Sequence, residues 1–405
     1  MPIAAFLREN ARWIAGGLLL TFFSSFGQTF FISLSAGNIR SELGLSHGGF
    51  GVLYMLATLA SALTLPQLGK VVDRFPIAIV AAFSIPALAA ATVSMALATN
   101  VIWLGLTIYA LRLFGQGMMT HIAMTAMGRW FAAQRGRAVS LATLGHQGGE
   151  ALFPVLFVVA AAAIGWRGTW LAAAALLALV ALPAIFALMR VERQPRANEA
   201  AARRTASRDW TRGEVMRDPV FWMSLIGILA PGFIATTIFF HQVYLSDLRG
   251  WGPEVFAGSF AVSASMTVIF ALVAGQLIDR FAAIRIMPVF LVPLAASCFV
   301  LATVESPWGA YVFMALMGIS NGFSSTLAGA LWPELYGTRH LGSIRSAIVA
   351  LMVFSTAMGP GLTGWLIDIG VPYGGQIAAM GVYCLAACLL MIHVRSRALA
   401  RDPGM

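Results

Sequence analysis

The stretch ALRLFGQGMMTHIAMTAMGRWFAAQRGRAVSLATLGHQGGEALFP, residues 110–154, decides the fold. It consists of two long apolar segments that are joined by a short basic loop. Each segment carries one ionisable residue well inside it, Arg112 in the first and Glu150 in the second. A charge at that depth in lipid costs on the order of 2.5–3.5 kcal/mol, and it usually faces a partner or a water-filled cavity. The stretch therefore predicts two neighbouring membrane-spanning helices with a polar interior.

The composition of the whole chain agrees with this interpretation. Of its 405 residues, 59% are hydrophobic and 10% are charged, whereas a soluble protein carries about 25% charged residues. A net charge of +10 would suggest nucleic acid in a soluble protein. Here the arginines lie in short loops, where positive charge sets membrane topology. We therefore expect a multi-pass membrane protein with the lipid bilayer, and no nucleic acid, as its partner.

Twelve segments are long and apolar enough to span a bilayer, which takes about 20 residues. With the N-terminus inside, 22 of the 26 basic residues fall in inner segments, so the positive-inside rule places both termini in the cytoplasm. The arginine-rich basic side suggests a bacterial inner membrane. The expected spans are 12–36, 48–68, 76–98, 101–127, 138–164, 168–189, 219–245, 254–275, 285–303, 307–332, 341–367 and 374–394.

An internal repeat divides the chain into two halves. The motif LGKVVDRF, with Gly69, Asp73 and Arg74, recurs 206 residues later as AGQLIDRF, with Gly275, Asp279 and Arg280. Parallel six-span repeats imply two bundles with a substrate path between them. We expect an all-α protein of two pseudo-symmetric six-helix bundles, with the first bundle at 1–189, a cytoplasmic linker at 190–218 and the second bundle at 219–405.

These motifs resemble those of the major facilitator superfamily, over essentially all of residues 10–395. Gly69-x-x-x-Asp73-Arg74 is similar to that family's signature between spans two and three, and Arg112-x-x-Gly115-x-Gly117 is similar to a second family motif. The resemblance implies a secondary transporter that works as a monomer by alternating access. The two loop motifs would gate it, through Gly69, Asp73, Arg74, Gly275, Asp279 and Arg280.

Within the family, the chain resembles the bacterial monocarboxylate and oxalate–formate branch. The run Gly128-Arg129-Trp130-Phe131 followed by Arg135-Gly136-Arg137 carries that resemblance, with weaker support from the FFHQ at 239–242. Span one has no lysine, and span eight has no Asp–Arg pair, which departs from a simple lactate-type site. The resemblance implies a small organic anion as substrate.

Polar residues on spans four and five form the predicted core of the site. Arg112, Gln116 and Thr120 recur at helical spacing and make one stripe, whereas His121 falls on a different face. On span five, His146 and Glu150 share a face with Gln147 at its edge. An Arg112–Glu150 contact is expected, either as a structural ion pair or as a pair that an anionic substrate disrupts. In the second case protonation of Glu150, through His146, would free the arginine and couple transport to protons.

Four further residues are candidates for the substrate path, and each has ordinary packing as the alternative. Polar residues in membrane bundles often only join helices. For the cytoplasmic motifs the alternative to gating is topology-setting charge alone. The four further candidates are Gln28, Tyr54, Asn321 and His241.

Motif searches exclude enzyme chemistry. The chain has no Gly-rich phosphate loop ending in Lys-Ser/Thr and no HExxH, and its three cysteines fit apolar filler better than a metal site. We expect no cofactor and no metal. Two alternatives stay open: an exporter of amphipathic or aromatic compounds, and a membrane sensor or assembly partner that does not transport.

Overall fold

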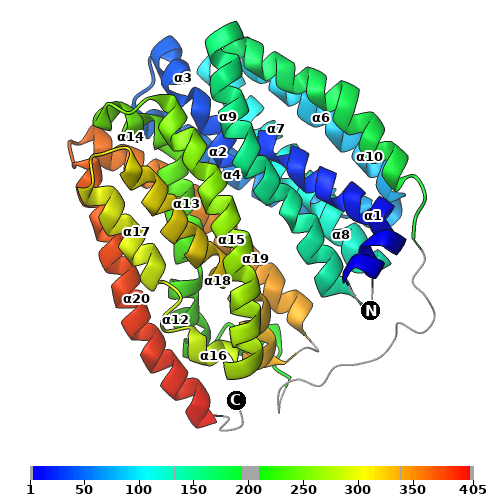
Figure 1. Cartoon of the computed structure of the whole chain (residues 1–405), viewed down its shortest axis with the longest axis vertical. Coiled ribbons are helices and arrows are strands. Elements are labelled where there is room, and N and C mark those ends of the chain that lie inside the picture. The colour runs from blue at the N-terminus through cyan, green and yellow to red at the C-terminus, as the bar shows by residue number, and fades with distance from the viewer. Residues whose placement is uncertain (1–2, 132–133, 194–208, 338–339, 402–405) are drawn as a thin grey trace. The chain divides into compact units, whose positions relative to one another are not determined.

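The computed structural model describes residues 3–131, 134–193, 209–337 and 340–401. These form two compact helical units, Met1–Ala202 and Arg203–Met405. The boundary between the units falls inside the linker expected at 190–218, of which residues 194–208 lie outside the described part. Each unit consists of helices alone in its described part (Figure 1).

The first unit holds the following elements: α1 (Ile3–Phe23), η1 (Ser24–Gly27), α2 (Thr29–Ile32), η2 (Ser33–Ser35), α3 (Ala36–Leu43), α4 (His47–Leu68), α5 (Val71–Arg74), α6 (Ile77–Leu97), α7 (Val101–Leu111), η3 (Arg112–Met119), α8 (Thr120–Trp130), α9 (Arg135–Leu176), η4 (Leu177–Ala181) and α10 (Leu182–Met189).

The second unit holds these: α11 (Arg212–Val215), α12 (Pro219–Ile228), α13 (Ala230–Phe240), α14 (Gln242–Arg249), α15 (Pro253–Phe281), α16 (Ala283–Ile286), α17 (Val292–Thr303), α18 (Trp308–Tyr336), α19 (Leu341–Asp368) and α20 (Tyr373–Arg401).

Eight helices of the described chain are long and apolar enough to cross a membrane, or nine if the bent pair Phe6–Gly27 and Thr29–Leu43 is one further span. The other expected spans lie in merged or less apolar helices. Arg137–Met189 is one helical stretch of 53 residues, but it breaks at Gly165, whose φ of 72° favours glycine. It therefore contains both 138–164 and 168–189. Helix α17 is shorter than predicted, and α18 carries polar residues at its middle.

The helix pairing in the second unit repeats that in the first. In the first unit α1 packs against α9, α4 packs against α7 and η3, and α6 packs against η4 and α10. In the second, α13 packs against α19, α15 against α18, and α17 against α20 (Figure 1). In order of expected spans these pairs are one–five, two–four and three–six, and then seven–eleven, eight–ten and nine–twelve. The repeat seen in the loop motif thus extends to the packing.

The first span is not a continuous helix. It changes to a 3-10 turn at Ser24–Gly27, and Gln28 has extended backbone (φ −87°, ψ 154°) before helix resumes at Thr29. The two pieces differ in direction by 42°. Because such a break frees backbone carbonyls inside the membrane, it is tolerated only where protein or a cavity satisfies them.

A close helix crossing lies beside this break. A Cβ placed on Gly27 would stand 2.1 Å from the Leu111 carbonyl oxygen and 2.7 Å from the Gly115 Cα, and a Cβ on Gly115 would stand 2.6 Å from the Gly27 Cα. Only glycine fits at both positions, so the break in span one sits directly against the π-helical segment η3 of span four.

Charged side chains cap both ends of the third span of each unit, which is α6 in the first unit and α16 followed by α17 in the second. At the amino end, the Glu192 carboxylate accepts a hydrogen bond from the Ile77 amide at 3.0 Å in the first unit. In the second unit, the Glu334 carboxylate accepts one from the Ala283 amide at 2.9 Å. Ile77 and Ala283 are related by the repeat offset of 206 residues, but the two glutamates are not. Negative charge at a helix amino end is favourable.

At the carboxyl end the caps are arginines. Arg167 donates to the carbonyls of Ala96 and Ala98, whereas Arg249 donates to those of Ala302 and Val304. The carbonyls again match at the repeat offset, and the arginines again come from different loops.

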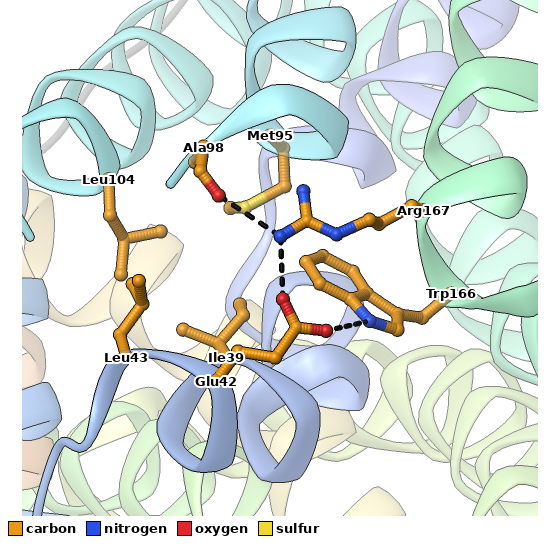
Figure 2. A pocket seen from close by; sticks show the side chains of 8 residues that line it. All are labelled: Ile39, Glu42, Leu43, Met95, Ala98, Leu104, Trp166 and Arg167. Atoms are coloured by element: carbon orange, nitrogen blue, oxygen red, sulfur yellow. Dashed lines mark hydrogen bonds and ion pairs between the residues drawn. The ribbon is translucent and has the colours of Figure 1, made fainter. Parts of the chain in front are cut away.

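In the first unit a further ion pair holds the arginine cap. Arg167 pairs with Glu42 at 2.6 Å and lies over the Trp166 ring, whose Nε1 also donates to Glu42 (Figure 2). These side chains line a small hollow at the end of α6.

Asp218 fastens the start of the second unit. Its carboxylate accepts hydrogen bonds from two guanidinium nitrogens of Arg401 at 2.7 and 2.8 Å, from the Tyr336 hydroxyl at 2.9 Å and from the Val220 amide at 3.1 Å. Burial alone would raise the Asp218 pKa, but these bonds to its charged form hold that pKa below its ordinary value. The carboxylate ties α12 to the ends of α18 and α20.

Candidate substrate-binding site

Arg112 begins the π-helical segment η3 in the interior of the first unit, and only 4% of its surface is exposed. Its Nη1 donates to the Gly27 carbonyl and to the Thr29 hydroxyl, both at 3.3 Å. The guanidinium carbon lies 5.4 Å from the centre of the Tyr54 ring, within range of a cation–π interaction. The break in span one thus supplies the carbonyl that anchors the arginine.

Tyr54 and Thr29 are themselves joined. Their hydroxyls lie 2.7 Å apart, and Tyr54 is fully buried. The pair connects α4 to α2 and supports the guanidinium from two sides. Both predicted residues, Arg112 and Tyr54, therefore belong to one contact, and Gln28 lies between the two residues that Arg112 bonds.

One edge of the Arg112 guanidinium has no partner in the described part of the chain. Nε is buried without a hydrogen bond, and both bonds that the side chain makes use Nη1. The Nε and Nη2 groups form the planar fork that binds carboxylates with two parallel hydrogen bonds. Arg112 is thus a buried cation whose fork has no partner among the described residues.

The expected Arg112–Glu150 contact is not formed: no ion pair joins the two among the described residues. Glu150, 7% exposed on α9, has the His146 Nε2 at 3.9 Å from its Oε2 as its neighbouring ionisable group. His146 also meets the Phe30 ring edge-on. The contact fails because the break in span one places Gly27 and Thr29, rather than α9, against the guanidinium. The expected pairing of His146 with Glu150 on one face of span five does occur.

The π-helical segment also changes the helical phase of span four. A π-helix bonds each residue to the fifth rather than the fourth along the chain, so it turns less per residue than the α-helix assumed from the sequence. His121, expected on a different face, faces α4 as Arg112 does. A Cβ on Gly69 would stand 3.0 Å from the His121 Nε2. Gln116 is half-buried one turn from Arg112.

The first cytoplasmic motif docks on the end of span four. Asp73 pairs with Arg129 at 2.9 Å, and the same Arg129 nitrogen donates to the Val72 carbonyl at 3.1 Å. Gly69 is needed where it lies, because a side chain there would meet His121 and the Leu65 carbonyl. Arg74 is exposed.

The second copy of the motif differs. A Cβ on Gly275 would meet nothing within 4 Å, and the exposed Arg280 lies over its neighbour Phe281. The side chain of Asp279 lies outside the described part. Gly275 therefore lacks the close contact that requires a glycine in the first copy.

The second unit contains two further predicted site residues, His241 and Asn321, which lie at different helical elements. His241 is buried where helix gives way between α13 and α14, with its Nε2 3.3 Å from the Pro360 carbonyl oxygen and its ring 5.7 Å from that of Tyr373. Asn321 is half-buried at the middle of α18. In the first unit, the Gln147 Oε1 is buried without a hydrogen bond.

Sequence reasoning missed Thr29 and Arg129. Thr29 follows the break, and the polar run Ser24-Ser25-Phe26-Gly27-Gln28 was its only signal. Arg129 was noted for its motif, but nothing in the sequence indicates its pairing with Asp73.

The fold and this site define an all-helical multi-pass membrane protein of two repeated units, with a buried arginine in the interior of the first. Comparison with known families agrees: residues 17–360 match the model of the Major Facilitator Superfamily. The chain belongs to that superfamily and is a transporter rather than an enzyme.

Individual relatives are distant. The chain is 24% identical over 301 residues to monocarboxylate transporter 13 of Bos taurus, which covers 73% of this chain and 68% of the relative. It is 28% identical over 127 residues to monocarboxylate transporter 14 of Homo sapiens, across 31% of this chain and only 25% of that protein.

Solved structures show the same fold along the whole chain. A bacterial homologue of the human lysosomal transporter Spinster, in an inward-facing and occupied conformation, is 17% identical with a TM-score of 0.67, covering 100% of this chain and 98% of its own. The nucleoside transporter NupG, in a mutant form, is 14% identical with a TM-score of 0.66, covering 96% and 100%.

Proposed function

We propose that this protein moves a small organic anion of the monocarboxylate kind across the inner membrane of a bacterium, by alternating access of its two units. The observation that carries the proposal is the Arg112 guanidinium, buried and anchored through Nη1 alone, with its Nε–Nη2 fork empty. An uncompensated charge in a membrane interior is costly, and a carboxylate in the fork would offset that cost. The distant similarity to monocarboxylate transporters supports the same substrate class.

Proton coupling is assigned to Glu150 with His146. The Glu150 carboxylate is buried and has no hydrogen bond in the described part of the chain, with only the imidazole 3.9 Å away. Its protonation state therefore changes the charge in the interior of the first unit by one unit. A proton on Glu150 reduces the repulsion of the substrate's charge, so anion and proton move together.

We assign the role of cytoplasmic gate to the loop motif that contains Asp73. Asp73 and Arg129 hold the loop after span two to the end of span four, the same span that carries Arg112. Both termini lie in the cytoplasm under this proposal, since the basic residues gather on that side. The protein functions as a monomer.

The exporter alternative receives less support. Phe26, Phe31 and Phe153 lie in a buried aromatic cluster around the break in span one, with Phe26 4.6 Å from Phe153 and Phe31 5.0 Å from Trp170, ring centre to ring centre.

Uptake into proteoliposomes tests the proposal. Purified protein should accumulate radiolabelled monocarboxylates when the outside is acidic. Arg112→Lys keeps the charge but lacks the fork, so uptake should fall at least about tenfold, as expected for loss of about 1.4 kcal/mol or more of charge-assisted bonding.

Two outcomes would overturn it. One is anion uptake by Arg112→Lys and Arg112→Gln that equals wild type; the other is transport only of neutral or cationic aromatic compounds. For the coupling residue, Glu150→Gln should keep anion exchange but lose accumulation driven by pH, and an unchanged response to the pH gradient would contradict that role.

A further inference from the structure

The face of α4 that meets span four carries a second unsatisfied group. The Thr58 hydroxyl is buried, with 2% of the residue exposed, and has no hydrogen-bond partner. Threonines in helices commonly donate to the carbonyl four residues back. Thr64, Thr237 and Thr267 all do so here. Thr58 does not, so its hydroxyl is directed away from its own backbone.

Contacts on either side show where Thr58 lies. Four residues earlier, Tyr54 underlies the Arg112 guanidinium. Seven residues later, Leu65 lies 3.2 Å from the position of a Cβ on Gly117. Positions 54, 58 and 65 share one helix face, so Thr58 stands on the seam between α4 and η3, one turn or about 6 Å from Tyr54. Among the described residues, Arg112 Nε and the Thr58 hydroxyl are buried donors of this seam without a hydrogen bond.

We propose that Thr58 is a specificity-determining residue of the Arg112 site. Its hydroxyl donates to an oxygen of the bound anion that lies outside the carboxylate held by the arginine fork. Leaving a buried donor unsatisfied costs about 1–3 kcal/mol, and a ligand that supplies the missing acceptor recovers it. The site therefore favours carboxylates that bear a second acceptor beside the carboxylate. This inference rests on the proposed anion site and deepens it.

Gln116 and Tyr54 do not fill this role. The Tyr54 hydroxyl is engaged with Thr29, and Gln116 is half-exposed, so water satisfies its amide at little cost. Sites built to hydrogen-bond a substrate group reject analogues that lack it far better than apolar pockets reject an added group. Thr58 gives this site such a means of selection.

The experiment compares butyrate with 2-oxobutyrate, which differ by one acceptor oxygen, in equilibrium binding to the purified full-length protein. Wild type should prefer 2-oxobutyrate about fivefold, as a hydrogen bond of about 1 kcal/mol predicts. Thr58→Val keeps the side-chain shape and removes the hydroxyl. It should abolish that preference by weakening 2-oxobutyrate binding while butyrate binding stays within twofold of wild type.

Thr64→Val is the matched control. It makes the same chemical change on the same helix, at a hydroxyl that bonds the Ala60 carbonyl and the Tyr109 hydroxyl, and the preference should remain. A Thr58→Val protein that keeps the full preference overturns the inference while the anion site stands. Failure of wild type to bind either acid, with a normal unfolding transition, overturns the proposed function itself. Equal weakening of both acids by Thr58→Val shows a packing role and also overturns the inference.

Discussion

The position of Arg112 depends on neighbouring side chains. The Tyr54 hydroxyl is hydrogen-bonded to the Thr29 hydroxyl, which in turn accepts a hydrogen bond from Arg112. Tyr54→Phe keeps the ring beneath the guanidinium and removes the hydroxyl that makes this link. We expect a two- to tenfold rise in KM for the transported anion with kcat nearly unchanged, from loss of about 0.5–1.5 kcal/mol of positioning. Initial-rate uptake across a concentration series measures it; a fall in kcat alone would contradict the positioning role.

The Gly27–Gly115 crossing tolerates no side chain. Gly115→Ala places a methyl group 2.6 Å from the Gly27 Cα, and such overpacking costs about 1–3 kcal/mol. The apparent melting temperature in detergent should fall. Gly213→Ala is the control, because nothing lies within 4 Å of its added methyl, and it should leave the melting temperature unchanged or slightly raised.

Asp218 makes stability depend on pH in one direction. Its pKa in the folded protein lies below its ordinary value, so its stabilisation is fully present above the unfolded pKa of about 3.9 and is lost as pH falls through the folded value. Asp218→Asn should lower stability by about 1–3 kcal/mol at neutral pH. Thermal unfolding from pH 8 to pH 3 measures this effect. The difference in stability between Asp218→Asn and wild type should stay constant above about pH 5 and narrow only below about pH 4.

At the scale of elements, the composition and the 206-residue repeat were enough to predict the helices and their grouping. Gly165 at the turn between spans five and six ends a helix where the sequence placed the loop. The departures from regular helix were not predictable. The 3-10 turn at Ser24–Gly27 and the π-helical segment at Arg112–Met119 lie where two glycines pack against each other, and a contact between distant residues leaves no local pattern.

These departures explain the errors in the predicted site. Regular helical spacing grouped Arg112 with Thr120 and separated it from His121. Because of the π-helical segment, His121 instead faces α4, as Arg112 does. The same spacing on span five, which is regular α-helix at that point, correctly paired His146 with Glu150. Arg112 was singled out from its depth in an apolar segment alone, a signal that does not depend on helical phase.

The π-helical segment has a testable consequence of its own. A π-bulge holds one residue more than the α-helix it interrupts, so deleting Met118 should restore α-helix and rotate α8 relative to Arg112. His121 and Arg129 would then leave α4 and Asp73. We expect expression to persist and transport to fall at least tenfold, with faster hydrogen exchange confined to α5 and the loop around it, measured by mass spectrometry.

Substitution of Met118 by leucine is the control for that deletion. It keeps chain length and approximate volume, and such swaps usually cost less than about 1.5 kcal/mol. Equal loss of transport in both variants would assign the effect to packing instead of helical phase.

At the scale of the whole molecule, the Asp73–Arg129 pair is energetically small. Its side chains are 37% and 72% exposed, and exposed pairs contribute about 0–1 kcal/mol. Such an amount hardly changes stability but shifts a balanced two-state equilibrium several-fold. Asp73→Asn should therefore favour the inward-open state with a nearly unchanged melting temperature. Accessibility of an introduced cysteine from each side of the membrane measures the shift.

Arg129→Gln should act in the same way, and the exchanged pair Asp73→Arg with Arg129→Asp should restore the wild-type distribution. If the exchanged pair still favours the inward-open state, each charge acts separately through its place in the membrane topology and not through contact with the other side chain.

The caps on α6, α16 and α17 show what the two halves of the molecule have in common. The unpaired peptide groups at a helix end interact favourably with a nearby charge. These groups are the same whichever residues form the helix end. Arg167 and Arg249 supply that charge from unrelated loops, as Glu192 and Glu334 do at the other end. An alignment of the halves residue against residue would score all four as unmatched. What the duplicated halves share at these ends is a location for charge, and any loop within reach is able to supply it.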